Sequence, residues 1–65
     1  MNLIEGLQSE MNRVREIIAE YETIPAGQFA AALMKADIEI AENAIATGNT
    51  ITMMRVLKEL KGYEI

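Results

Sequence analysis

Apolar residues recur at alternating steps of three and four along the first third of the chain. We call this set the N-terminal stripe; it consists of Ile4, Leu7, Met11, Val14, Ile18 and Tyr21. The spacing places all six side chains on one face of an α-helix, and it predicts a helix from Leu3 to Glu22. The stripe occupies the two alternating heptad positions through which one helix packs against another.

A proline-containing turn separates this helix from a second one. Proline lacks an amide hydrogen and disfavours helical geometry in the residue before it, so the segment from Thr23 to Gly27 is predicted to interrupt the helix. We expect Pro25 to open the second helix as its first residue, with Ile24 packing back against it. The second helix is then predicted to run from Pro25 to Thr47 and to stop at Gly48-Asn49 in a left-handed turn.

The last quarter of the chain predicts a third, shorter helix. Thr50 is expected to cap a helix from Ile51 to Lys61, and Gly62 to end it. Its buried face is expected to consist of Met53, Val56, Leu57 and Leu60. The short link before it predicts that the second and third helices form an antiparallel hairpin. The expected fold class is therefore all-α, with a long first helix followed by this hairpin, in a single domain of residues 1–65.

The length of the chain bears on where the first helix packs. A chain of 65 residues buries only about 60% of the surface that its unfolded form exposes, so a lone monomer has marginal stability. Chains of this size usually recruit a disulfide, a metal or a partner subunit. With no cysteine and no histidine, we expect a homodimer or higher homo-oligomer whose interface is the N-terminal stripe. The alternative, in which the first helix closes the hairpin within its own chain, stays open.

The residue types that are missing also limit the chemistry. Without histidine or cysteine, neither Ser-His nor Cys-His catalysis nor an ordinary zinc site is available. The sequence carries no glycine-rich phosphate loop and no calcium-binding loop. We therefore expect a protein that is not an enzyme and that binds no cofactor or metal. No apolar run approaches the roughly 20 residues of a membrane span, and the N-terminus lacks the pattern of a secretion signal, so we expect a cytoplasmic protein.

Charge is distributed unevenly along the chain. Ten acidic and six basic residues give a net charge of −4. Residues 1–49 hold eight acids and three bases, a sum of −5, whereas residues 50–65 hold two acids and three bases, a sum of +1. Most of this surface would repel a phosphate backbone. We therefore do not expect nucleic acid as a partner, and we expect contact with a protein instead.

Several polar and adaptable side chains are candidates for partner or ligand contact. They are Arg13, Arg15, Asp37, Met54, Arg55 and Lys58. Asp37 lies within an apolar arc of the second helix, where a carboxylate needs a hydrogen bond or a counter-charge. Two alternatives stay open: a structural pair with Arg13, Arg15, Lys61 or a tyrosine hydroxyl, or a carboxylate that faces a partner. Methionine is common at adaptable binding surfaces, which makes Met54 a candidate contact.

The basic residues suggest a second hypothesis. Five cations are available for binding an anion, namely Arg13, Arg15, Arg55, Lys58 and Lys61. An oligomer could use them to capture a small anionic ligand, such as a nucleotide signal, in pockets between subunits. This alternative belongs to a different class of function from protein binding.

The segment from Asn12 to Asn49, with its Ile-Pro-Ala-Gly turn and acidic, alanine-rich second helix, resembles small uncharacterised helical proteins encoded by bacteriophages and prophages. The resemblance implies that the chain acts in the cytoplasm of a bacterial host. Small phage proteins of this kind commonly bind and inhibit a host protein, as anti-defence factors do, or sequester a host signal molecule. The resemblance assigns no functional residue.

Overall fold

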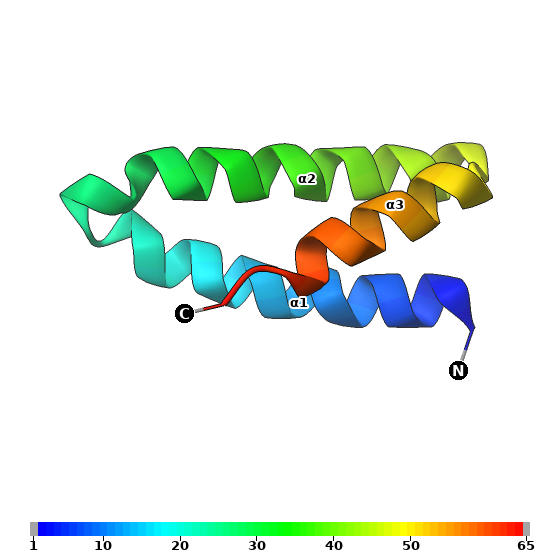
Figure 1. Cartoon of the computed structure of the whole chain (residues 1–65), viewed down its shortest axis with the longest axis horizontal. Coiled ribbons are helices and arrows are strands. Elements are labelled where there is room, and N and C mark those ends of the chain that lie inside the picture. Colours follow the sequence, from blue (N-terminus) through cyan, green and yellow to red (C-terminus); the bar gives the residue numbers. More distant parts are fainter. Residues whose placement is uncertain (1, 65) are drawn as a thin grey trace.

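The computed structural model describes residues 2–64, and this part of the chain forms three α-helices and one short 3-10 helix. Helix α1 spans Leu3–Glu22, η1 spans Pro25–Gly27, α2 spans Gln28–Thr47 and α3 spans Thr50–Lys61. Helices α1 and α2 form a long antiparallel hairpin, and α3 folds back along α2 to pack against both (Figure 1). The all-α, three-helix fold predicted from the sequence is confirmed. Within residues 2–64, no helix is long and apolar enough to cross a membrane.

The helix ends follow the predicted signals with two differences. Helix α1 has the predicted bounds, and Gly48 ends α2 with a left-handed φ of 68°. The residues from Pro25 form a separate 3-10 turn, so α2 begins later, at Gln28. The cap of α3 is Asn49 rather than Thr50, because the Asn49 side chain accepts a hydrogen bond from the Thr52 backbone N–H at 3.0 Å. Asparagine and threonine are both good capping residues, so the pattern placed the helix correctly but not its cap.

The core runs along the centre of the bundle and contains residues of all three helices. Its buried members are Leu7, Met11, Val14, Ile17, Ile18, Ala31, Met34, Ile38, Ala41, Ala44, Met53, Val56 and Leu60. The alanines of α2 let the helices approach closely, since they add little bulk at the contact. Three of the four residues predicted for the buried face of α3 are in this core, and the fourth, Leu57, packs against its edge.

The N-terminal stripe is buried within its own chain. Leu7, Met11, Val14 and Ile18 are enclosed in the core, whereas Tyr21 is half-buried and Ile4 is exposed. The first helix thus closes the hairpin into a bundle, which is the second of the two alternatives above. The prediction that this stripe forms the interface between copies is wrong for the four enclosed residues, because α2 and α3 already cover them. Ile24, which was expected to pack back, is half-exposed.

Gly27 lets the turn between the two long helices pack closely against the end of α1. A Cβ atom at this position would lie 2.6 Å from the carbonyl oxygen of Tyr21, on the last turn of α1. Because the clash is with backbone, no side-chain rotation relieves it. The turn between α1 and α2 therefore requires glycine for close approach, although its φ of −90° is accessible to other residues.

This contact predicts that Gly27→Ala destabilises the protein by about 2 kcal/mol, since forcing an extra carbon into a packed contact costs about 1–3 kcal/mol. Gly62→Ala is the matched control, because a Cβ there meets only the Glu59 carbonyl oxygen at 3.4 Å, an ordinary contact. We expect that control to stay within about 0.5 kcal/mol of the native chain. Urea denaturation followed by circular dichroism measures both, and equal effects would contradict the assignment.

Candidate functional site

Asp37 and Tyr63 join the C-terminal tail to α2. The Tyr63 hydroxyl donates a hydrogen bond of 2.6 Å to Oδ2 of Asp37, and both residues are half-buried. A tyrosine hydroxyl was one of the structural partners expected for this carboxylate. Burial, the hydrogen bond to Asp37 and the negative charges of Asp37 and Glu59 together raise the pKa of Tyr63 to about 12. Tyr63 is therefore a neutral phenol at neutral pH, and Asp37 accepts its hydrogen bond within the same chain.

Arg13 caps the C-terminal end of α3. Its Nη2 donates to the carbonyl oxygen of Leu60 at 2.8 Å and its Nη1 donates to that of Tyr63 at 2.7 Å. The guanidinium also pairs with Glu10, its Nη2 lying 3.2 Å from Oε1. The last carbonyls of a helix have no partner within the helix and carry partial negative charge, so an arginine is well suited to them. This candidate contact residue thus has a structural role.

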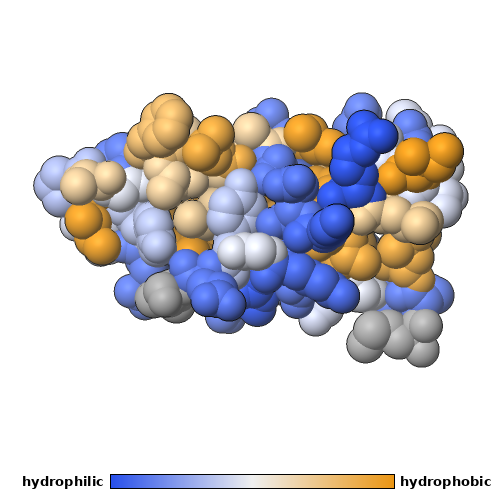
Figure 2. Space-filling model, viewed as in Figure 1, coloured by the Kyte–Doolittle hydropathy of each residue, from blue (hydrophilic) through white to orange (hydrophobic). Residues whose placement is uncertain are grey.

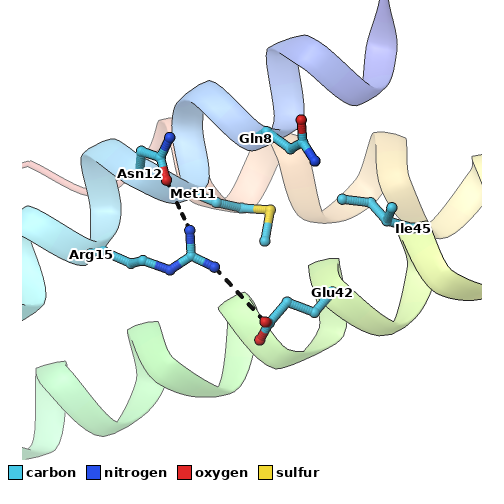
Figure 3. Close-up of a pocket in the computed structure, with 6 residues that line it drawn as sticks. All are labelled: Gln8, Met11, Asn12, Arg15, Glu42 and Ile45. Atoms are coloured by element: carbon cyan, nitrogen blue, oxygen red, sulfur yellow. Dashed lines mark hydrogen bonds and ion pairs between the residues drawn. The ribbon is translucent and has the colours of Figure 1, made fainter.

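Arg15 lies in an open groove of about 410 Å³ between α1 and α2 (Figure 3). Its Nη1 donates to Oδ1 of Asn12 at 2.9 Å, and its Nη2 lies 3.9 Å from Oε2 of Glu42 on α2. The groove is lined by Gln8, Met11, Asn12, Arg15, Glu42 and Ile45. An anion entering it would meet one cation whose charge Glu42 already balances in part.

The five cations proposed for an anionic ligand do not converge within the chain. Arg13 caps α3 and Arg15 lies in the groove between α1 and α2. Arg55 lines a shallow groove between α2 and α3, whereas Lys61 lies beside the N-terminal end of α1. A pocket for a small anion would therefore have to be assembled from several chains, which is the arrangement that this alternative supposes.

The surface of α3 that faces away from the bundle combines apolar and basic side chains. We call it the outer face of α3; it consists of Ile51, Met54, Arg55 and Lys58. These positions are separated by three, four and seven residues, so they form one continuous face. Ile51 is 72% exposed and Met54 is 58% exposed. Of the three ion pairs formed within residues 2–64, none includes Arg55 or Lys58.

A second exposed apolar surface runs along α2, and we call it the α2 stripe; it consists of Phe29, Leu33, Ala36 and Ile40. Phe29 is 77% exposed, and Leu33 and Ile40 are 50% and 46% exposed. In the space-filling view, apolar side chains line the edge of the molecule over α2 (Figure 2).

Neither the α2 stripe nor Ile51 was predicted from the sequence as a contact site. The available signal was that α2 carries apolar residues around most of its circumference. Ala31, Met34 and Ile38 lie on the side of α2 that faces the core. The α2 stripe lies on another side of the helix, where its residues follow one another at steps of four, three and four. A helix that is apolar on more than one side is typical of a helix that packs on more than one side.

The raised pKa of Tyr63 predicts how stability changes in alkali. The folded chain holds the phenolic proton up to a pKa of about 12, whereas an unfolded tyrosine releases it near pH 10. The stabilisation from this contact is therefore fully present below pH 10 and is lost as pH rises to 12. Tyr63→Phe is expected to lose about 1 kcal/mol below pH 10, and the difference from the native chain is expected to shrink between pH 10 and 12.

A spectroscopic titration tests the same contact directly. In a Tyr21→Phe chain, Tyr63 is the remaining tyrosine, so the absorbance change on ionisation reports this residue alone. We expect a midpoint at about 12 and, when Asp37→Asn is added, a midpoint closer to 10. A midpoint near 10 in the Tyr21→Phe chain itself would show that the Asp37 contact does not form.

The two arginines of α1 predict unequal effects. Arg13→Gln removes hydrogen bonds from a charged donor to α3 and the tail, which is expected to cost about 1–3 kcal/mol. Arg15→Gln removes an exposed ion pair and is expected to cost less than about 0.5 kcal/mol. Both changes remove one positive charge from the same helix, so each controls for the other. Urea denaturation gives the comparison, and a larger loss for Arg15→Gln would contradict the assigned cap.

Comparison with protein-family models, with curated proteins and with solved structures found no match for this chain. The resemblance of residues 12–49 to phage-encoded proteins therefore stays a hypothesis from the sequence. The evidence bearing on function is the surface of the bundle itself, in particular the outer face of α3 and the α2 stripe.

Proposed function

We propose that this chain is a non-enzymatic interaction protein that binds a host protein through the outer face of α3 and inhibits or modulates it. The observation that carries the proposal is that this face combines two exposed apolar side chains with two cations. The apolar side chains are Ile51 and Met54. The cations, Arg55 and Lys58, belong to none of the ion pairs formed within residues 2–64. The phage resemblance supports a host protein as the target and an anti-defence role as its purpose.

Electrostatics favours this face over the rest of the surface. Residues 50–65 have a net charge of +1, whereas residues 1–49 have a net charge of −5. The outer face of α3 contains Arg55 and Lys58 and no acid. An acidic partner surface would thus be attracted to α3 and repelled by most of α1 and α2, which orients the encounter.

The apolar part of the face supplies the contact after the encounter. Ile51 and Met54 lie one turn apart on the outer side of α3. Apolar side chains on one helical face are the usual anchors when a helix docks into a hydrophobic groove. Methionine adapts its shape to irregular surfaces. The matching partner is a protein with an apolar groove bordered by carboxylates.

The scaffold keeps this face ready for binding. Helix α3 is held at its N-terminal end by the Asn49 cap and at its C-terminal end by Arg13. Its buried side packs Met53, Val56 and Leu60 into the core. Because the helix is already ordered, binding requires little loss of backbone entropy.

A quantitative capture experiment tests the proposal. The immobilised native chain is compared in a bacterial host lysate with Met54→Glu, with Lys58→Glu and with Ala19→Glu. Ala19 is exposed on α1, outside both surfaces described above, so it controls for added negative charge. We expect a host protein to be retained by the native chain and by Ala19→Glu but lost with Met54→Glu and Lys58→Glu.

The captured protein, once purified, allows a stricter measurement by calorimetry. Met54→Glu is expected to weaken its affinity by about ten-fold or more, since central apolar anchors contribute about 2 kcal/mol or more. Added salt is expected to weaken native binding, and less so for Lys58→Glu. Equal retention by all four chains, in variants that keep the native circular dichroism spectrum, would refute the outer face of α3 as the binding site.

A further inference from the structure

The α2 stripe is an apolar helix face without a partner in the chain. It lies outside the core and does not belong to the outer face of α3, so the proposed function does not use it. Its positions follow the two alternating heptad positions of a helix that packs lengthwise against another helix. We propose that the α2 stripe binds the same stripe of a second copy, so that two antiparallel α2 helices form a symmetric dimer.

The spacing of the stripe fits an antiparallel two-fold pair in one register. In such a pair, residues whose numbers add to 69 face each other across the interface. Phe29 then lies opposite Ile40 of the second copy, and Leu33 lies opposite its Ala36. Two-fold symmetry repeats both layers. All four positions of the stripe are thus paired, and each Leu33 side chain faces a small residue that leaves room for it.

Other arrangements pair these side chains less well. Shifting the antiparallel register by one heptad toward the C-terminus sets Phe29 opposite Thr47 and Leu33 opposite Asn43, which leaves polar groups against apolar ones. A parallel pair sets Ala36 against Ala36, which leaves a gap between the larger layers, and gaps in packing cost stability. The antiparallel pair also opposes the two helix dipoles.

The charged residues beside the stripe are compatible with this register. Asp37 and Glu39 flank it, one on each side. In the antiparallel pair, Asp37 lies next to Ala30 of the second copy and Glu39 next to its Ala32. Each acid therefore faces a small apolar residue rather than another acid, so the net charge of −4 per chain does not place like charges in contact. Asp37 also keeps its hydrogen bond with Tyr63.

The size of the contact sets its expected strength. Helix α2 has 20 residues, and two helices of this length packed side by side bury on the order of 1,000 Å² in total, the lower limit for a specific interface. We therefore expect a reversible dimer that forms at high micromolar concentration and dissociates on dilution.

Sedimentation equilibrium of the full chain tests the dimer. We expect the native chain to approach twice its mass of 7.2 kDa as concentration rises, with a melting temperature that rises in parallel. Leu33→Glu is expected to be monomeric at the same concentrations while keeping its helical spectrum, because Leu33 is outside the core. Ile51→Glu, the matched control on the outer face of α3, is expected to dimerise like the native chain.

Cross-linking tests the antiparallel register. The chain has no cysteine, so a single introduced thiol is unambiguous. In the proposed pair, two copies of residue 36 are offset by three residues, about 4.5 Å along the helix axis, whereas two copies of residue 47 are about 37 Å apart. Under a short bifunctional maleimide, Ala36→Cys is expected to form covalent dimers about ten-fold faster or more than Thr47→Cys.

Three results would overturn the proposal. The first is a monomer at high micromolar concentration with a melting temperature independent of dilution, which would leave the stripe to a different occupant. The second is a dimer that Leu33→Glu does not weaken, which would place the contact elsewhere. The third is equally fast cross-linking at positions 36 and 47, which would indicate a parallel pair. None of these results bears on host-protein capture through Met54, so the two proposals fail separately.

Discussion

The contact on which the rest of this structure depends is the enclosure of the N-terminal stripe by α2 and α3 of the same chain. Leu7 and Val14 are completely buried, and Leu60 of α3 packs with them in the same core. This arrangement uses the most regular apolar face of the chain for folding. Of the seven large apolar side chains that are exposed within residues 2–64, five lie on α2 or α3.

Polar contacts complete the bundle where its helices are unequal in length. Helix α3 has 12 residues, whereas α1 and α2 have 20 each, so α3 covers only part of the hairpin. The tail after α3 lies along α1 and is held by α1 and α2 at several points. Arg13 donates to the Tyr63 carbonyl oxygen, Tyr21 donates to that of Glu64, and Tyr63 donates to Asp37. Residues that the sequence offers as ligand contacts are thus used to fix the tail.

Periodicity and turn chemistry predicted the helices well because both act locally. The bounds of α1 and the left-handed stop at Gly48 depend on neighbouring residues alone. The same pattern could not decide which chain covers the N-terminal stripe, since apolar spacing specifies a helical neighbour but not its connection. The sequence offered a tyrosine hydroxyl among the possible partners of Asp37. It did not identify Tyr63 as the partner, because Tyr63 lies 26 residues away in sequence. The exposed stripe on α2 was missed because its residues merge with the core-facing ones on a helical wheel.

The two proposed surfaces have consequences for each other. In the antiparallel α2 pair, two-fold symmetry gives each copy the same outer face of α3. Such a dimer would carry two equivalent binding faces, and a target with two copies of the matching groove would be held at both when the spacing allows. Arg55 lies where the surfaces meet, since it lines a shallow groove with Asp37 and Ile40. Substitutions there would affect both contacts, whereas Leu33 and Met54 separate them.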